Sequence, residues 1–290
     1  MSSPVRRNVA VVSVGYGSAA EIASMLGSLP AAATAPPVVV VADNRPDSDA
    51  TQDVTLAAGA TYLPMPGNLG YGGAVNAAVR SLPPEIEWVL ITNPDVLLHE
   101  GAIDRLVEKG EAADDIGAVG PLVRNDDGSV YPSAREVPGI RTGSGHALFA
   151  NLWPSNPWTR QYQATTATEA ERDAGWLSGS CVLVRRTAFE EVGGFDEGFF
   201  MYFEDVDLGY RLGRAGWRNR FTPAAEVTHT GGHSTAGESA AMVRAHHRSA
   251  ERFIRKKYPG AWFWPVRAVL LTGLRLRSLL AERRAVHPAA

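Results

Sequence analysis

Five acidic residues lie among aromatic residues and glycines in residues 192–217, whose sequence is VGGFDEGFFMYFEDVDLGYRLGRAGW. Acids set among Phe and Tyr side chains are partly desolvated, which raises the affinity of an ionised carboxylate for a proton or a metal ion. This stretch is therefore the first candidate for acid–base chemistry or cation binding. Its acids are Asp196, Glu197, Glu204, Asp205 and Asp207.

The second half of this stretch predicts a helix over residues 204–215. Acids fill its first turn, arginines its last, and a glycine follows, all in agreement with the helix dipole. Glu204 and Asp205 are thus expected at a helix start, directly after an aromatic turn. The alternative is a capped helix without chemistry, and we favour it for Asp207, which can pair with Arg211 at i,i+4.

Glycines and polar residues also follow the predicted strands of the first half of the chain. Apolar runs at residues 9–14, 38–42 and 88–92 are typical of buried parallel strands, and open α/β sheets bind ligands beyond the carboxyl ends of their strands. Strand, glycine turn, helix and strand with a terminal acid predict a nucleotide-binding α/β unit. The residues at these strand ends are Gly15, Tyr16, Gly17, Asp43, Asn93 and Asp95.

Two alternatives remain open for these strand ends. The pattern G-x-G-x-x-A from Gly15, with an acid after the second strand, also resembles a dinucleotide-binding fingerprint, so a nicotinamide-dependent oxidoreductase is a rival hypothesis. Asp95 directly after a proline is also what an ordinary turn would need.

Three further segments combine glycine with polar side chains. Residues 66–73, PGNLGYGG, precede a helix predicted over 74–80, and their glycines let backbone N–H groups approach an anion, with a flexible loop as the alternative. Residues 177–184, LSGSCVLV, predict a buried strand whose small residues leave room for a ligand. His229 and His233 share a glycine-rich loop, which modestly favours metal or phosphate contact.

The composition is that of a folded protein with a full core. The chain has 290 residues, of which 45% are hydrophobic and 20% charged. Its single cysteine, Cys181, excludes a disulfide framework and fits a reducing compartment, and no signal peptide is predicted. Residues 125–175 are rich in Gly, Pro, Ser and Thr and are too long for an idle loop, so they predict a lid, an insertion or a substrate wall.

Positive charge collects towards the C-terminal end. From Arg244 onward eleven Lys/Arg stand against two Asp/Glu, a balance of +9, and because the whole chain carries −3 the first 243 residues carry −12. This asymmetry predicts an anionic partner, either a membrane surface or a phosphate-bearing substrate, rather than nucleic acid. Residues 240–258 predict a basic helix. Residues 262–284 are too short in apolar sequence to span a bilayer, so they predict interfacial attachment or, alternatively, a helix packed on the body.

Taken in order, these motifs resemble those of inverting glycosyltransferases of family 2, which have the GT-A fold. The resemblance covers residues 9–234. Within the family the chain is most similar to bacterial rhamnosyltransferases that act on polyprenyl-diphosphate-linked N-acetylglucosamine in the mycobacterial cell-wall linker. The motifs are VVVVADNRPDSD, NLGYGGAVNAA, ITNPDVLL, LSGSCVLVRR, GGFDEGFFMYFEDVDLGYRLGRAGW and THTGGHS.

The resemblance implies an α/β fold of the GT-A type in three parts. Residues 1–124 would be the nucleotide-sugar-binding half, residues 125–239 the acceptor-binding and catalytic half, and residues 240–290 a basic helical extension that associates with membrane. The donor-binding residues would be Gly15, Tyr16, Gly17, Asp43, Asn68, Gly70, Gly73, Asn76, Asn93 and Asp95, with Asp43 on the nucleobase.

The resemblance also implies the catalytic roles. Asp205 would be the general base that deprotonates the acceptor hydroxyl, and Glu204 would orient Asp205 or the acceptor. Asp95, the surviving carboxylate of the family's Asp-x-Asp motif, would hold Mg²⁺ or Mn²⁺ together with His229, since Asn93 replaces the first Asp. The acceptor side would be Trp176, Ser178 and Gly179, with a buried core position as the alternative for Trp176.

The implied reaction is transfer of L-rhamnose from dTDP-L-rhamnose to a polyprenyl-diphosphate-linked N-acetylglucosamine with inversion. The alternatives are a UDP- or GDP-sugar donor, a NAD(P)-dependent oxidoreductase and a non-catalytic sugar- or nucleotide-binding relative. The expected partners are the donor, the lipid-linked acceptor and an anionic membrane surface at the cytoplasmic face of the plasma membrane, and a homodimer is a further expectation. The cations expected to meet the lipid diphosphate or headgroups are Arg252, Arg255, Lys256 and Lys257.

Overall fold

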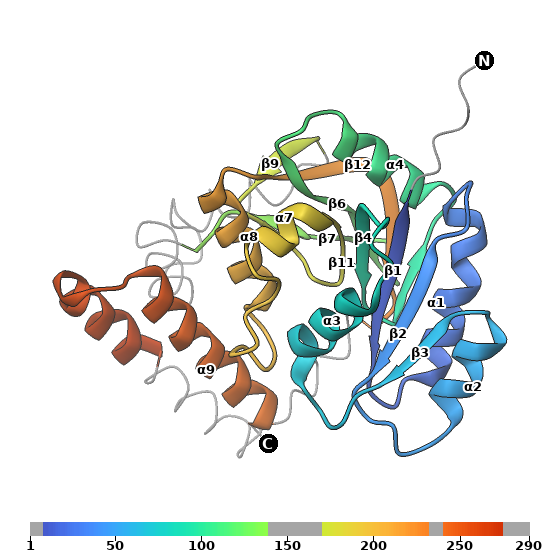
Figure 1. The fold of residues 1–290 in the computed structure, drawn as a ribbon. Helices are drawn as coiled ribbons and strands as arrows, with labels where there is room; N and C mark the ends of the chain where they lie inside the picture. Colours follow the sequence, from blue (N-terminus) through green and yellow to red (C-terminus); the bar gives the residue numbers. More distant parts are fainter. Residues whose placement is uncertain (1–7, 139–169, 232–239, 275–290) are drawn as a thin grey trace.

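The computed structural model describes residues 8–138, 170–231 and 240–274, and its centre is a mixed sheet with helices on both faces (Figure 1). In these residues the sheet has ten strands, with the main order β3-β2-β1-β4-β11-β6-β12-β5. The first four strands along the chain are parallel, as their continuous apolar runs predict. They are β1 (Val9–Gly15), β2 (Val38–Asp43), β3 (Thr61–Pro64) and β4 (Trp88–Thr92).

Strand β11 (Cys181–Arg185) joins the two halves of the chain, because it pairs antiparallel with both β4 and β6 (Ile116–Asn125). Strand β12 (Arg218–His229) then runs parallel to β6, and the short β5 (Val96–Leu98) lies antiparallel to β12. The halves expected on either side of residue 124 therefore share one sheet. Two short strands extend it, β7 (Val130–Tyr131) beside β6 and β9 (Arg172–Ala174) beside β12.

The core forms two layers, one on each face of the sheet, because successive strand residues point to opposite faces. Val11 and Leu90 belong to the layer covered by α1 and α4. Val12 and Ile91 belong to the opposite layer, covered by α3 and α8, which carry the predicted site (Figure 1). The helices are α1 (Ala19–Ala32), α2 (Ala50–Ala57), α3 (Gly70–Ser81), α4 (Ala102–Glu111), α7 (Arg186–Glu191) and α8 (Glu204–Ala215).

Two helices flank the predicted site, and the sequence located one of them better than the other. Helix α8 spans the predicted residues, and the expected pair forms, with Arg211 Nε 2.7 Å from Asp207 Oδ2. Helix α3 begins at Gly70, four residues before the prediction. Gly70 adopts a left-handed φ of 74°, and its N–H donates to Asn68 Oδ1 at 2.9 Å, so a short turn already leads into the helix.

The single strand predicted over residues 177–184 is wrong, because the chain leaves the main sheet at residues 178–180. The Ser178 N–H donates to Ser133 O at 2.7 Å, and the hydroxyls of Ser178 and Ser180 lie 3.0 Å apart. Serine hydroxyls that bond locally offer the backbone an alternative to a strand ladder. Residues before the break pair elsewhere, since β10 (Trp176–Leu177) and β8 (Ala134–Arg135) form a separate two-stranded sheet.

The basic helix predicted near the C-terminal end is α9 (Ala240–Lys257), and it packs on the body of the protein (Figure 1). Its Phe253 is 2% exposed and shares a small apolar cluster with Trp176, Phe199 and Val206. Helix α9 is thus the basic helix predicted over residues 240–258, and its apolar side is buried against the protein. A short 3₁₀ helix, η2 (Ala261–Phe263), follows, and within the described residues no helix is long and apolar enough to cross a membrane.

The structure describes only the ends of the irregular region predicted over 125–175, in which β7, β8 and β9 form. The predicted lid, insertion or substrate wall falls largely on residues 139–169, which lie outside the described residues, as do His233 and the arginines at 275 and 277.

Candidate active site

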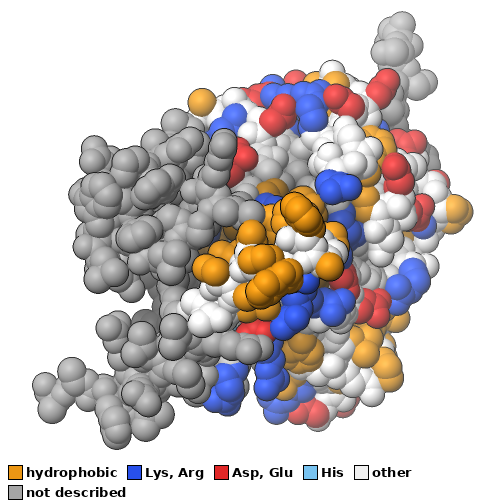
Figure 2. All heavy atoms as spheres, turned by 90° about the vertical axis from the view of Figure 1, so that its left-hand side faces the viewer, with side chains coloured by type: hydrophobic (Ala, Val, Ile, Leu, Met, Phe, Trp, Pro, Cys, Tyr) orange, Lys and Arg blue, Asp and Glu red, His pale blue; other side chains and the backbone are white. Residues whose placement is uncertain are grey.

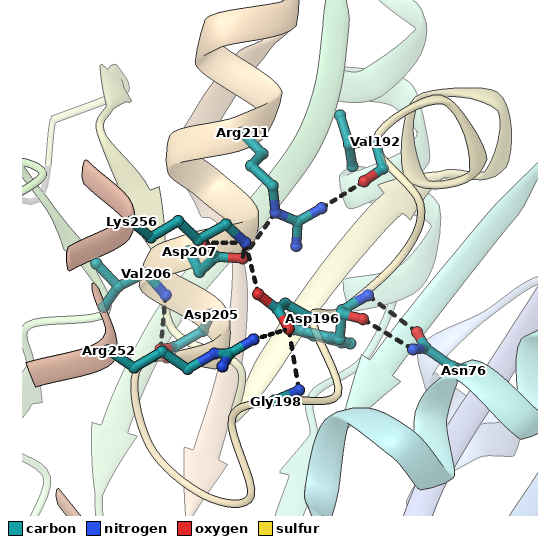
Figure 3. Close-up of polar contacts among 11 residues, drawn as sticks. Asn76, Val192, Asp196, Gly198, Asp205, Val206, Asp207, Arg211, Arg252 and Lys256 are labelled. Atoms are coloured by element: carbon teal, nitrogen blue, oxygen red, sulfur yellow. Dashed lines mark hydrogen bonds and ion pairs between the residues drawn. The ribbon is translucent and has the colours of Figure 1, made fainter. Parts of the chain in front are cut away.

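Asp205 lies in the first turn of α8, and both of its carboxylate oxygens accept backbone hydrogen bonds. The Gly179 N–H donates to Oδ2 at 3.0 Å, and the Val206 N–H donates to Oδ1 at 2.8 Å (Figure 3). The residues at 178–180, which leave the main sheet, therefore fix the direction of this side chain. Of the predicted acceptor residues, Gly179 is thus in direct contact with the predicted base.

Burial sets the charge state of the neighbouring pair Glu204 and Asp205. Glu204 is 9% exposed, and burial together with the charge of Asp205 raises its pKa to about 8. Burial also raises the pKa of Asp205, although the N–H groups of Gly179 and Val206 oppose this rise by stabilising the ionised form. The raised pKa of Glu204 keeps this acid protonated at pH 7, whereas the two N–H groups favour the ionised form of Asp205.

The turn before these acids has an unusual backbone. Tyr202 and Phe203 both have a φ of 67°, in the left-handed region that residues other than glycine rarely adopt. Such conformations cost about 1–3 kcal/mol each and persist only where the surroundings enforce them. These two residues directly precede Glu204, so their left-handed backbone sets the direction in which α8 starts.

Asp95 and His229 come together at the far end of β12. His229 Nε2 lies 3.1 Å from Asp95 Oδ1, and Thr230 donates its N–H and hydroxyl to the Asp95 carbonyl at 2.9 and 3.0 Å. The buried His229 Nδ1 has no hydrogen-bond partner in the described part of the chain. The predicted metal ligands are thus adjacent, and one buried nitrogen atom remains to be satisfied. Among the described residues, no cluster of three or more His, Cys, Asp or Glu forms.

The two acidic centres are connected through the end of β4. The Asn93 N–H donates to Ser180 O at 2.8 Å, which joins the segment that leads to Asp95 to the segment that binds Asp205. Tyr71 is influenced by both centres. Burial raises the pKa of its hydroxyl well above the usual value, and the charges of Glu204, Asp205 and Asp95 add to the rise. The strand ends that were expected to meet therefore do meet on one side of the sheet.

The predicted nucleotide loops lie at the ends of β1 and β2. Tyr16 is 57% exposed, and the Arg45 guanidinium lies 5.6 Å from the centre of its ring. Asp43 is fully buried, and its carboxylate accepts hydrogen bonds from the Arg45 N–H at 2.9 Å and the Tyr62 hydroxyl at 3.0 Å. The Asn44 side chain holds the glycine-rich loop of residues 66–73 in place by donating to Gly70 O at 3.0 Å.

Like Asp43, the predicted site residues Asn76 and Trp176 are occupied by contacts within the protein. The Asn76 amide accepts from the Phe195 N–H at 2.9 Å and donates to Phe195 O at 2.9 Å (Figure 3). The expected donor contact of Asn76 therefore gives way to a structural one, which holds the glycine-rich turn before α8. Trp176 is 9% exposed and donates its indole N–H to Glu136 O at 3.2 Å, so the alternative core position describes it better than stacking on a sugar.

The basic helix does not present its charges as expected, because three of its four predicted ligand cations bind the protein itself. Arg252 and Lys256 pair with acids of the body, and Lys257 donates to Pro138 O. Arg255 differs, with a side chain that is 57% exposed. Net charge in the sequence predicts attraction to anions, but it does not show which cations acids of the same chain already neutralise.

Two residues of the site were missed by sequence reasoning. The Tyr71 hydroxyl donates to Gly179 O at 2.7 Å, on the peptide unit next to the N–H that binds Asp205, and its place in NLGYGG was the available signal. Arg135 lies 5.5 Å from the ring centre of Tyr131 and 5.4 Å from that of Trp176. Its charge opposes the rise in the pKa of Asp205. No sequence signal marked it, since it belongs to an irregular region.

A mixed sheet with glycine-rich loops at its strand ends, a buried acidic pair at the start of a following helix and an Asp–His pair are features of the class of GT-A glycosyltransferases. Residues 6–251 match the family described as glycosyltransferase like family 2, and the chain belongs to that family. It is therefore a glycosyltransferase, and the predicted fold and enzyme class are confirmed.

The similar curated proteins include rhamnosyltransferases. The chain is 43% identical over 288 residues to the N-acetylglucosaminyl-diphospho-decaprenol L-rhamnosyltransferase of Mycobacterium tuberculosis, covering 96% of this chain and 94% of that protein. It is 27% identical over 225 residues to the rhamnosyltransferase WbbL of Escherichia coli, covering 76% of this chain and 82% of that protein.

Among solved structures, a mannosyltransferase of Pyrobaculum calidifontis in complex with GDP-Man and Mn²⁺ superposes with a TM-score of 0.60 at 17% identity, covering 98% of this chain and 77% of that one. The TarS 1–349 structure of S. aureus gives a TM-score of 0.54 at 16% identity, covering 83% and 65%. These likenesses support the fold.

Proposed function

We propose that this glycosyltransferase moves L-rhamnose from dTDP-L-rhamnose to a polyprenyl-diphosphate-linked N-acetylglucosamine, with inversion, in cell-wall polysaccharide assembly. The observation that carries the proposal is the 43% identity to the mycobacterial rhamnosyltransferase, which extends over 96% of the chain and so through the whole site. The arrangement of Asp205, Asp95 and His229 agrees with it.

Asp205 acts as the general base. It takes the proton of the acceptor hydroxyl while the oxygen attacks the anomeric carbon, and the bond from that carbon to the diphosphate breaks with its electron pair leaving on the nucleotide. The Gly179 and Val206 N–H groups hold the carboxylate in one direction. Glu204, protonated at neutral pH, leaves Asp205 as the base of the pair and can donate a hydrogen bond to the acceptor.

Asp95 and His229 would hold a Mg²⁺ or Mn²⁺ ion. The Asp95 carboxylate and His229 Nε2, which lies 3.1 Å from it, are oxygen and nitrogen ligands that suit such an ion, and oxygens of the donor diphosphate would complete the set. The bound cation would neutralise negative charge on the departing diphosphate. The loops at Gly15, Asp43 and Gly70 bind the nucleotide in this proposal.

The C-terminal segment attaches the enzyme to the membrane that carries its acceptor. Figure 2 shows hydrophobic side chains gathered on the face of the C-terminal segment, with Lys and Arg side chains beside them. Trp262 is 91% exposed, Trp264 64% and Val269 64%, and tryptophan is favoured at membrane interfaces. Arg252 and Lys256 of α9 pair with acids of the body, so insertion of the exposed aromatic residues contributes to the attachment alongside the remaining cations.

The first test is thermal stabilisation by dTDP, UDP, GDP and NADH, each with Mg²⁺, with Mn²⁺ and with chelator. We expect a metal-dependent rise in Tm with dTDP, followed by transfer of rhamnose to a lipid-linked N-acetylglucosamine. A preference for UDP or GDP would contradict the rhamnose donor, and a rise with NADH alone would overturn the glycosyltransferase assignment.

Two variants test the assigned roles. Asp205→Asn should lower kcat by about 100-fold or more, because a general base commonly contributes 10²–10⁴-fold, while the dTDP-dependent Tm rise persists.

Asp95→Ala should instead remove the difference between metal and chelator in donor binding. Near-wild-type turnover of Asp205→Asn, or unchanged metal dependence of Asp95→Ala, would remove the residue from its role.

A further inference from the structure

The strained turn before Asp205 needs an external support. Tyr202 and Phe203 both hold a left-handed backbone, and Asp205 follows two residues later. Unless contacts from elsewhere enforce such a turn, it relaxes to an ordinary conformation and changes where α8 begins. Because Asp205 Oδ2 lies 3.0 Å from the Gly179 nitrogen, a shift in the start of α8 would lengthen this hydrogen bond.

Helix α9 supplies the support on the aromatic side of the turn. Ser249 Oγ donates to Met201 O at 2.7 Å, directly before the strained pair. The His246 ring meets the Tyr202 ring edge-on at 5.4 Å and the Phe203 ring at 5.3 Å. The helix thus contacts both strained residues and the carbonyl that precedes them.

Further along α9, two cations contact acids on either side of the same turn. Lys256 Nζ lies 2.7 Å from Asp196 Oδ2 and 2.8 Å from Asp207 Oδ1, and Arg252 Nη2 lies 2.8 Å from Asp196 Oδ1 (Figure 3). Asp207 has a fully buried side chain and also binds Arg211. Lys256 therefore ties the glycine-rich start of the turn, at Asp196, to the first turn of α8, at Asp207.

The acids of the network are the shielded members, since the Asp207 side chain is fully buried and that of Asp196 is 21% exposed, whereas Arg252 and Lys256 are 46% and 32% exposed. Burial raises the pKa of Asp196, but hydrogen bonds from Lys256, the Gly198 N–H and Arg252 outweigh it and lower the pKa to about 2. Removing one partner of a buried charge pair leaves an uncompensated charge, and the groups then rearrange to reach water. For Asp207, rearrangement would move the helical turn that also carries Asp205.

We propose that α9 is a clamp for the catalytic turn, in which Lys256 and Arg252 are positioning residues for Asp205. Both lie just beyond residue 251, where the match to the family ends. The basic helix is then an integral part of the catalytic half, and its charges act inside the protein. The proposal rests on the proposed role of Asp205 as the base.

The test compares Lys256→Met with Arg248→Met, a matched loss of one cation from the same helix at an exposed position. Lys256→Met should lower kcat about 10- to 100-fold, the range expected when a catalytic group is misplaced by about 1 Å. KM for the nucleotide-sugar should stay within about twofold, because the donor loops are untouched. Arg248→Met should leave both constants unchanged, and Lys256→Arg should restore most of kcat.

A structural readout separates this proposal from the proposed function. Hydrogen exchange of the Val206 and Asp207 amides, which bond to Asp205 Oδ1 and Phe203 O, should accelerate in Lys256→Met and not in Arg248→Met. If the wild-type protein transfers no sugar, the proposed function fails, while the exchange experiment still tests the clamp. If Lys256→Met fails to fold, Gly198→Ala serves instead, because a Cβ there would displace the Arg252 guanidinium without removing a charge. Unchanged exchange and unchanged kcat in the folded variant would overturn the clamp.

Discussion

At the scale of single residues, Glu204 and Asp205 are neighbours in sequence but have opposite roles. Both are acids in the first turn of one helix, but only the Asp205 carboxylate accepts a hydrogen bond from another segment, from the Gly179 N–H. Glu204 Oε2 is buried and has no hydrogen-bond partner within the described residues, so its charged form is the more costly one. A carboxylate and a carboxylic acid therefore lie side by side at neutral pH.

This difference predicts how stability depends on pH. The pKa of Glu204 is about 8 in the folded protein, above its unfolded value, so the folded state binds the proton more tightly. The free energy of unfolding should therefore fall as pH rises from about 5 to 8, by at most about 1.4 kcal/mol per pH unit. Glu204→Gln should remove this fall, as urea unfolding at several pH values would reveal. The exposed Glu85→Gln is the control, and equal pH slopes in Glu204→Gln and wild type would contradict the assignment.

At the scale of elements, the small cluster between α8 and α9 is a core of its own. Phe253 joins Trp176, Phe199 and Val206, which come from three different segments of the catalytic half. This cluster explains why a helix with so many cations stays on the protein rather than in solvent. Apolar burial on one side and ion pairs on the other hold it in place.

Phe253→Ala should consequently destabilise the protein by about 3–5 kcal/mol, the usual cost of removing a buried phenylalanine ring. Phe263→Ala is the matched control, since that ring is 39% exposed and should cost less than about 1 kcal/mol. Chemical unfolding measures both. A similar loss in the two variants would indicate that α9 is not anchored through this cluster.

At the scale of the whole molecule, charge and apolar surface are divided differently from what the sequence suggests. Arg252 and Lys256 of α9 pair with acids of the body, and the exposed aromatic residues Trp262 and Trp264 follow this helix in the chain. Binding to a bilayer should thus persist at high salt, where attraction between charges is screened.

The double variant Trp262→Ser/Trp264→Ser should weaken binding to vesicles of anionic phospholipid by about tenfold or more, because burying one large apolar side chain contributes roughly 1.5–3 kcal/mol. Co-sedimentation measures the bound fraction, and Leu56→Ser, at another exposed apolar position, is the control. Unchanged binding by the double variant, or by a chain truncated after Tyr258, would refute membrane attachment through this segment.

The sequence by itself determined the class of fold and most of the site. Continuous apolar runs are typical of buried parallel strands, and the polar ends of such strands meet at one edge, as Asp95 and the 178–180 segment do. Helix signals at residues 204–215 placed Glu204 and Asp205 correctly because caps and charges act locally.

Tertiary structure alone decided which side chains remain available for chemistry. Asn76, Trp176 and Lys256 are of types that bind ligands, yet each is occupied by partners between 35 and 120 residues away in the chain. Tyr71 and Arg135 joined the site in the same way, through contacts over long stretches of chain. The local sequence shows which chemistry a side chain is capable of, whereas packing between distant segments determines its partners and its exposure to solvent.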